Sequence, residues 1–180
     1  MVVVPPAVRL AFAIGRCGVN ARSRSPLGLM DTSLDNFLHR LPVMTGLDEA
    51  ALQFLCGFAR EENHAAGAAI VREGEPGDRV YFICQGRVQV VKDHGAELPV
   101  VLAEMGPGDY FGEMSLVESF VRSASVVALE PTRLFTLKGA NFYKLYLAQP
   151  DQYGIVILNI ARDLARKLRR LDDRFVTGCH

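Results

Sequence analysis

The chain has 180 residues, 49% of them hydrophobic, which is enough for one domain with a core and a terminal element. Its 20 basic residues are balanced by 20 acidic residues, which argues against a general binder of polyanions. It contains no run of about 18 or more apolar residues, so no membrane insertion is expected. The four cysteines are widely spaced and form no CxxC pair. They are expected to be reduced, and the expected location is cytoplasmic.

Residues 1–30 differ from the rest of the chain because they contain four arginines and no acidic residue. Pro5, Pro6 and Arg9 interrupt the apolar segment that a secretory signal needs. We expect a flexible leader, or a start codon assigned too early with Met30 as the initiator. A targeting segment is the alternative.

Residues 31–66 are predicted to form N-terminal helices. Segments 33–41 and 47–60 have helical spacing, and in the second an acidic first turn at Asp48 and Glu49 suits the helix dipole. The second segment carries one apolar face: Leu47, Ala51, Leu52, Leu55 and Phe58.

Residues 67–138 consist of short β-rich runs separated by turns such as EPGD and GPGD. Seven or eight strands at this spacing are typical of a closed sandwich or jelly roll. We therefore predict a mainly β protein with flanking helices: a double-stranded β-helix (jelly-roll) barrel with N-terminal helices and a long C-terminal helix.

Residues 139–176 are predicted to form C-terminal helices, over 140–149 and from Pro150 to about Phe175, followed by a tail at 177–180. A helix of about 25 residues spans roughly 37 Å, so part of its apolar stripe is expected to meet a partner. The stripe comprises Ile157, Ala161, Leu164, Leu168, Leu171 and Phe175. The other faces are expected to be solvated; they carry Arg162, Arg166, Lys167, Arg169, Arg170, Arg174, Asp163, Asp172 and Asp173.

The segment FGEMSLVESFVRSASV, residues 111–126, places an acid and a base near the two ends of a short connection. A helix beginning near Glu113 directs free N–H groups at an anion, Gly112 allows close approach, and Arg122 adds a charged donor. The Glu113 carboxylate would then accept a hydrogen bond from a ligand hydroxyl. A ligand that carries both a phosphate and a ribose would satisfy Arg122 and Glu113 together. The alternative is a surface ion pair between Glu113 and Arg122, worth about 0–1 kcal/mol. Spacing alone does not separate these two hypotheses.

The stretch GPGDYFGEMSLVESFVRSASVVA resembles the phosphate-binding cassette of cyclic nucleotide-binding domains. Such domains occur in regulatory subunits of cAMP-dependent protein kinase and in bacterial catabolite-activator-type regulators. The upstream stretch IVREGEPGDRVYFICQGRVQVV is similar to the first three strands of that family. The resemblance covers about residues 40–175.

The resemblance implies specific roles for individual residues. Glu113 would accept from the ribose 2′-hydroxyl and Arg122 would bind the cyclic phosphate, together with nearby backbone N–H groups. Val88 and Val100 would line the base pocket. We expect cAMP as the ligand. The Ser123 hydroxyl could reach the phosphate or the base, so cGMP is the alternative ligand. The implied ligand-binding residues are Gly112, Glu113, Met114, Ser115, Arg122, Ser123, Val88 and Val100.

The expected function is that of a cyclic nucleotide sensor or regulatory protein whose C-terminal helices move on binding. The long helix resembles the dimer helix of catabolite-activator-type proteins, so we expect a homodimer and an effector protein that the sequence does not name. No helix-turn-helix follows this helix, and no direct sequence-specific DNA binding is expected. The alternative is a ligand-free interaction or scaffold module, or a dimerising regulatory subunit, with the same fold.

Catalysis and metal binding are not expected. The four histidines, His39, His64, His94 and His180, are far apart in the sequence, and no P-loop, HExxH or nucleophile elbow is present. No cofactor is expected beyond the nucleotide ligand.

Overall fold

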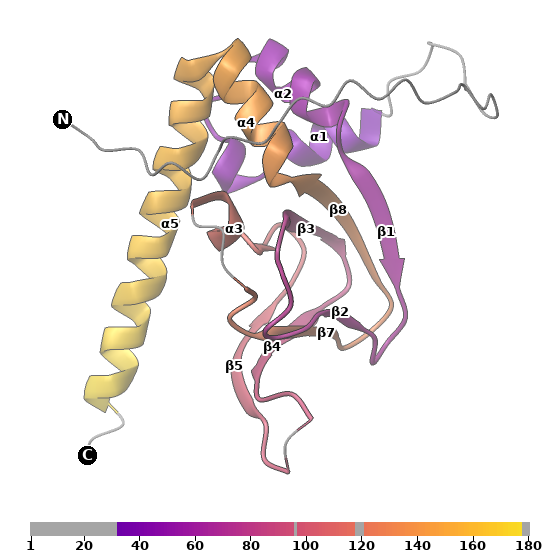
Figure 1. Ribbon diagram of the computed structural model, residues 1–180, viewed down its shortest axis with the longest axis vertical. Coiled ribbons are helices and arrows are strands. Elements are labelled where there is room, and N and C mark those ends of the chain that lie inside the picture. The colour runs from indigo at the N-terminus through magenta and orange to yellow at the C-terminus, as the bar shows by residue number, and fades with distance from the viewer. Residues whose placement is uncertain (1–31, 96, 118–120, 178–180) are drawn as a thin grey trace, which may run out of the picture.

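The computed structural model describes residues 32–95, 97–117 and 121–177. The expected leader therefore lies outside the described residues. Figure 1 shows two sheets facing each other below a layer of helices, with α5 running down one side. This arrangement confirms the predicted mainly β jelly roll with flanking helices and a long C-terminal helix.

Each sheet has four antiparallel strands, and the chain passes repeatedly from one sheet to the other. The first sheet has the order β1-β8-β3-β6 and the second β2-β7-β4-β5. The strands are β1 (Arg60–His64), β2 (Ala69–Val71), β3 (Arg79–Gln85), β4 (Val88–Lys92), β5 (Val100–Met105), β6 (Tyr110–Phe111), β7 (Ser125–Ala128) and β8 (Thr132–Lys138).

Strand β1 lies in the segment 31–66, where only helices were expected. Its sequence, REENH, has no apolar residue and therefore no alternation that would indicate a strand. It forms because its backbone pairs with β8, from Arg60 opposite Thr136 to His64 opposite Thr132. Tertiary pairing, and not side-chain pattern, determines this edge strand.

The helices cover the outer face of the first sheet. Strand β3 alternates: Val80 and Phe82 pack against the helices, whereas Tyr81 and Ile83 face the barrel interior. The helices are α1 (Thr32–His39), the 3₁₀ turn η1 (Pro42–Met44), α2 (Glu49–Cys56), α3 (Met114–Val117), α4 (Gly139–Ala148) and α5 (Pro150–Thr177).

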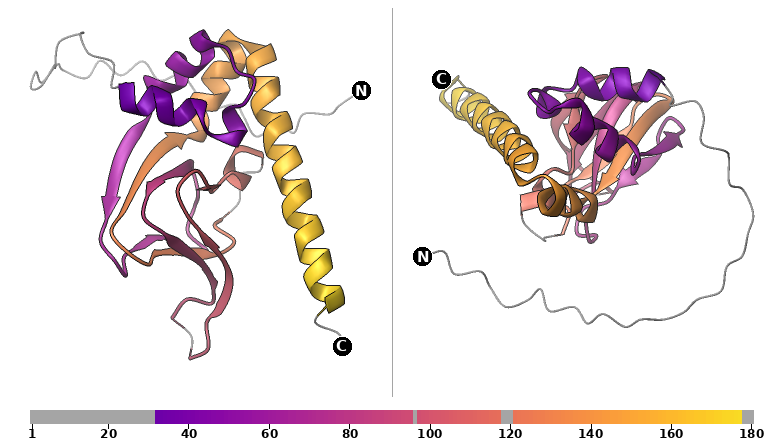
Figure 2. Two further views of the ribbon diagram at one scale, coloured as in Figure 1. Left: turned by 180° about the vertical axis from the view of Figure 1, so that it is seen from behind. Right: turned by 90° about the horizontal axis from the view of Figure 1, so that it is seen from above.

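Helix α5 is attached to this core by its N-terminal half. Val156 and Ile160 are buried, and the Asn159 amide donates to the backbone oxygens of Val43 and Thr45 at 3.1 and 2.8 Å. Figures 1 and 2 show its C-terminal half extending away from the helical layer beside the barrel. Within the described part of the chain, no helix has the length and apolar character needed to cross a membrane.

The buried stripe of α5 coincides with the predicted stripe only in part. The core contains Val156 and Ile160, while Ala161 and Leu168 of the predicted stripe are exposed. Leu164, also of the predicted stripe, packs against the core, so the core covers part of that stripe and leaves Ala161 and Leu168 open. The side chains of Leu171 and Phe175 lie outside the described residues.

Candidate functional site

The connection between β6 and α3 turns sharply at Gly112, whose φ is +82°. A Cβ atom at this position would lie 2.6 Å from Nη1 of Arg122 and 2.6 Å from the backbone oxygen of Arg79. Both the left-handed conformation and the close contact require glycine here. Gly112 therefore makes room for the Arg122 side chain.

A second glycine bounds the same side chain. A Cβ atom at Gly77 would lie 2.7 Å from Nε and 2.8 Å from Cζ of Arg122. The guanidinium group thus lies between two backbone segments that are far apart in the sequence. Gly77 was not predicted to belong to the ligand site, because a glycine in EPGD is also an ordinary turn residue.

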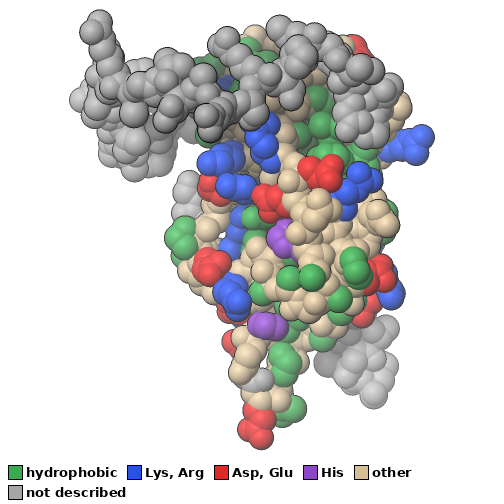
Figure 3. Space-filling model, turned by 90° about the vertical axis from the view of Figure 1, so that its right-hand side faces the viewer, with side chains coloured by type: hydrophobic (Ala, Val, Ile, Leu, Met, Phe, Trp, Pro, Cys, Tyr) green, Lys and Arg blue, Asp and Glu red, His purple; other side chains and the backbone are tan. Residues whose placement is uncertain are grey.

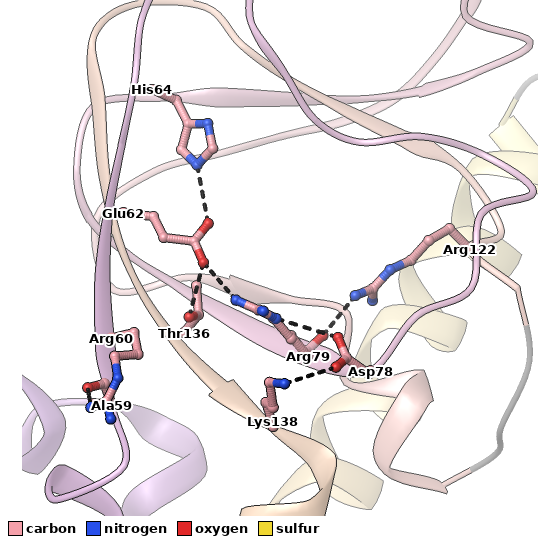
Figure 4. A network of polar contacts seen from close by, with 9 residues as sticks. All are labelled: Ala59, Arg60, Glu62, His64, Asp78, Arg79, Arg122, Thr136 and Lys138. Atoms are coloured by element: carbon pink, nitrogen blue, oxygen red, sulfur yellow. Dashed lines mark hydrogen bonds and ion pairs between the residues drawn. The ribbon is translucent and has the colours of Figure 1, made fainter. Parts of the chain in front are cut away.

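The backbone of Arg122 is fixed by the turn that follows β2. Its N–H donates to the oxygen of Glu75 at 2.8 Å, and its oxygen accepts from the N–H of Gly74 at 2.9 Å. Its Nη2 donates to the oxygen of Arg79 at 3.0 Å, as Figure 4 shows. The guanidinium carbon lies 5.6 Å from the ring centre of Tyr81.

No carboxylate among the described residues forms an ion pair with Arg122. The surface ion pair with Glu113, the alternative left open by spacing, is not formed, because Glu113 binds a different cation. Arg122 is half-buried, and within the described residues its guanidinium hydrogen-bonds to one neutral carbonyl. Such a group has the charge and the donors for an added anion.

Glu113 is buried, at 7% exposure, and its carboxylate points toward α5. Its Oε1 accepts from Nζ of Lys167 at 2.9 Å. Lys167 was expected on a solvated face of the helix, and that expectation was wrong for this residue. A basic residue in a run of arginines and lysines gives no sequence signal that it turns inward.

Lys167 belongs to a polar network that joins α5 to the barrel. Asp163 accepts from Lys167 at 3.2 Å and from the Tyr110 hydroxyl at 2.9 Å, and Lys167 also lies over the Tyr110 ring.

Burial and the hydrogen bond to Asp163 raise the pKa of Tyr110. Burial acts to lower the pKa of Lys167, but Glu113 and Asp163 outweigh it and raise that pKa. For Asp163, hydrogen bonds from Tyr110 and Lys167 outweigh burial and lower the pKa.

Ser123 and Met114 lie on the outer side of the site. The Ser123 hydroxyl lies 4.0 Å from Sδ of Met114, so the two ends of the cassette meet. The backbone oxygen of Ser123 accepts from Nζ of Lys92 at 3.0 Å. Lys92 is also paired with Glu73, and this hydrogen bond, with another from the Asp93 N–H, lowers the pKa of Glu73.

The other predicted site residues lie in different surroundings. Val88 is fully buried in the barrel core. Val100 begins β5 opposite Lys92 and is 53% exposed. Ser115 lies in α3, and its side chain is outside the described residues. The structure thus brings Gly112, Met114, Arg122 and Ser123 together and turns the Glu113 carboxylate toward α5.

The described part of the chain contains no group of three or more His, Cys, Asp or Glu side chains able to hold an ion. The titratable groups described at the site include the Arg122 guanidinium, the Lys167 ammonium, the Glu113 and Asp163 carboxylates and the Tyr110 hydroxyl.

Residues 61–149 match the model of the cyclic nucleotide-binding domain. The chain belongs to the cyclic nucleotide-binding domain family. A similar relative is the cyclic AMP receptor protein of Thermus thermophilus, 34% identical over 131 residues, 73% of this chain and 59% of that protein.

Solved structures of the family have the same fold. A cyclic nucleotide-binding domain from Methylobacillus flagellatus superposes with a TM-score of 0.70 at 25% identity, covering 81% of this chain and 82% of that one. The regulatory domain of Toxoplasma gondii PKA, crystallised with cAMP, gives 0.63 at 27% identity, covering 74% of this chain and 49% of that one. The chain thus spans 59% and 49% of the Thermus and Toxoplasma chains.

Proposed function

We propose that this protein is a cAMP-binding regulatory protein whose cassette holds the cyclic phosphate at Arg122. The observation that carries the proposal is the guanidinium between Gly77 and Gly112, which lacks a carboxylate partner among the described residues. Similarity to a cyclic AMP receptor protein and to a PKA regulatory domain crystallised with cAMP supports cAMP as the ligand.

The expected contacts follow from the residues around Arg122. The cyclic phosphate accepts from Arg122 and from backbone N–H groups near Gly112, Met114, Ser115 and Ser123. Glu113 accepts a hydrogen bond from the ribose 2′-hydroxyl. Val88 and Val100 line the pocket for the nucleotide base. The Ser123 hydroxyl leaves cGMP as a second nucleotide to be tested.

Coupling to α5 passes through Glu113, because this carboxylate already binds Lys167. A ribose hydroxyl that reaches Glu113 changes the position of Lys167, and with it the part of α5 that carries Asp163 and Lys167. Ligand binding and helix position are then linked by about 1–3 kcal/mol, a usual allosteric coupling energy. The movement of α5 is the signal passed to an effector protein or to a second copy of the chain.

Dimerisation is proposed through the part of α5 that the core does not cover. Ala161 and Leu168 of the predicted apolar stripe are exposed, and Leu168 is 60% exposed. A helix face with exposed leucine at heptad spacing suits a second copy of the same helix.

Isothermal titration calorimetry with cAMP and cGMP tests the binding. The wild-type chain is expected to bind cAMP, and Arg122→Ala is expected to weaken binding by about tenfold or more, since a hydrogen bond to a charged group contributes about 1.5–3 kcal/mol. Arg87→Ala is the matched control, because Arg87 is an exposed arginine paired with Glu130. Absence of heat for any cyclic nucleotide would favour a ligand-free interaction module.

Hydrogen exchange tests the coupling separately. Protection of the amides from Asp163 to Arg170 is compared with and without cAMP, and a change confined to α5 and the cassette is expected. Identical protection, with calorimetric binding intact, would show that the nucleotide binds without moving the helix.

A further inference from the structure

A pocket of about 330 Å³ lies at one end of the first sheet, where β1 and β3 begin and β8 ends. Its walls come from the end of α2, the start of α4 and these three strands. It contains no residue of the cassette at 111–126. The lining residues are Phe58, Arg60, Arg79, Thr136, Lys138 and Asn141.

Among the described residues around this pocket, Arg60 is the basic side chain that forms no ion pair. Arg79 pairs with Glu62 at 2.9 Å and with Asp78 at 3.4 Å, and Lys138 lies 3.7 Å from Asp78. Arg60 pairs with no carboxylate within the described residues. Its Nη1 donates only to the backbone oxygen of the preceding residue, at 2.9 Å. Three basic side chains thus face two acidic ones.

Asn141 supplies a neutral hydrogen-bonding group in the lining of the same pocket. It lies in the first turn of α4, is only 9% exposed, and its side-chain amide has no hydrogen-bond partner in the described chain. Its amide is not among the enclosed side-chain atoms that lack a partner, so solvent reaches it, and a ligand oxygen in the pocket can take the place of water on it. Lys138, the N-cap residue of α4, makes no side-chain cap, so the first-turn N–H groups add partial positive charge at the same end.

We propose that this pocket binds a small molecule carrying a phosphate group, independently of the cyclic nucleotide. Arg60 and Lys138 hold the phosphate oxygens, Asn141 hydrogen-bonds to one of them, and Phe58 provides an apolar wall. Figure 3 looks onto the β1 side of the molecule, where Lys and Arg side chains gather beside acidic ones. Glu62 and Asp78 restrict the pocket to a small anion, because an extended polyanion would meet both carboxylates.

The pocket and the cassette meet at Arg79. Its side chain lines the pocket, while its backbone oxygen accepts from Arg122. Figure 4 shows Arg60 and Arg122 on opposite sides of this residue. Arg79 is therefore left unchanged in the test, since its replacement would affect both sites.

Inorganic phosphate is the probe, titrated into the full chain carrying Arg122→Ala, which removes the cassette as an anion site. The ionic strength is held constant with chloride. We expect saturable shifts of the backbone amide resonances of residues 140–142 and of the side-chain amide of Asn141. Adding Arg60→Gln should raise the dissociation constant about tenfold or more, whereas adding Arg87→Gln, the matched surface control, should leave it within about twofold.

A second variant, Asn141→Asp, keeps the shape of the side chain and suits a helix N-terminus, but it repels an anion. It should also raise the dissociation constant about tenfold, with an unchanged melting temperature. Either of two results overturns the proposal: shifts that follow chloride as well as phosphate, or dissociation constants unaffected by both Arg60→Gln and Asn141→Asp. Because Arg122→Ala is present throughout, neither result depends on whether the cassette binds cAMP.

Discussion

The ammonium group of Lys167 lies 2.9 Å from Oε1 of Glu113, although 54 positions separate the two residues. Glu113 is the residue that the family resemblance assigns to the ribose, and Lys167 lies on the helix proposed to move. In the proposed complex, this one carboxylate has two alternative partners, the ammonium of α5 and the ligand hydroxyl. This shared carboxylate makes the coupling between ligand and helix testable with single substitutions.

Lys167→Met should destabilise the ligand-free protein and tighten cAMP binding. The substitution leaves the buried Glu113 carboxylate without its cation, which costs about 1–3 kcal/mol of unfolding free energy. A ribose hydroxyl then meets no competitor, and affinity should rise about five- to tenfold. Urea unfolding and calorimetry measure the two effects.

Arg170→Met is the matched control on the same helix, because Arg170 is exposed and the charge change is equal. It should leave both quantities nearly unchanged. Weaker cAMP binding in Lys167→Met would mean that Lys167 contacts the ligand and does not compete with it.

Gly77→Ala should disrupt the site through a steric effect alone. The added Cβ would lie 2.7 Å from Nε of Arg122, so the guanidinium must move out from between the two glycines. We expect cAMP affinity to fall about tenfold or more while the melting temperature changes little. Gly154→Ala is the control, because nothing lies within 4 Å of its added Cβ and alanine favours a helix. Unchanged cAMP affinity in Gly77→Ala would show that Arg122 does not bind the nucleotide.

The attachment of α5 should weaken in acid. The pKa of Asp163 is lowered in the folded protein, so its carboxylate stabilises the fold above its ordinary value of 3.8. That stabilisation is lost as pH falls through the lowered folded value. The difference in unfolding free energy between wild type and Asp163→Asn should therefore shrink from about pH 6 to about pH 3. An equal difference at both pH values would show that Asp163 contributes no charge-dependent stability.

Leu168→Lys should prevent self-association if α5 is the dimer helix. Leu168 is 60% exposed, and a lysine there would place like charges opposite each other across a two-fold interface. Sedimentation velocity should show a dimer for the wild type and a monomer for the variant. Leu147→Lys, an equally exposed leucine on α4, is the control and should remain dimeric. A wild-type monomer at high concentration would contradict the dimer.

The sequence predicted the fold class because most of its strands alternate or carry β-branched residues between glycine turns. Strand β1 escaped prediction because REENH has no apolar side chain, and only its pairing with β8 makes it a strand. The buried face of α5 was predicted only in part for a related reason: Leu164 packs against the core as expected, but Val156 and Ile160 were not in the predicted stripe. Heptad spacing shows that an apolar face exists, but packing against the core decides which neighbouring face is buried.

At the site, the pattern of Gly112, Glu113 and Arg122 could be read directly, since these residues lie within one short segment. The roles of Gly77 and Lys167 could not be predicted from the sequence, because each residue reaches the site from a distant part of the chain. A turn glycine and a lysine on a charged helix have many ordinary explanations. Only the folded arrangement indicates which of them face Arg122 and Glu113.

A crystal structure of the chain with cAMP most directly tests whether Arg122 holds the cyclic phosphate. The predicted result is a phosphate within hydrogen-bonding distance of the Arg122 guanidinium, with the ribose hydroxyl on Glu113 and Lys167 displaced from its present position. A complex in which Arg122 still donates only to the oxygen of Arg79, with the nucleotide bound elsewhere, would contradict the account.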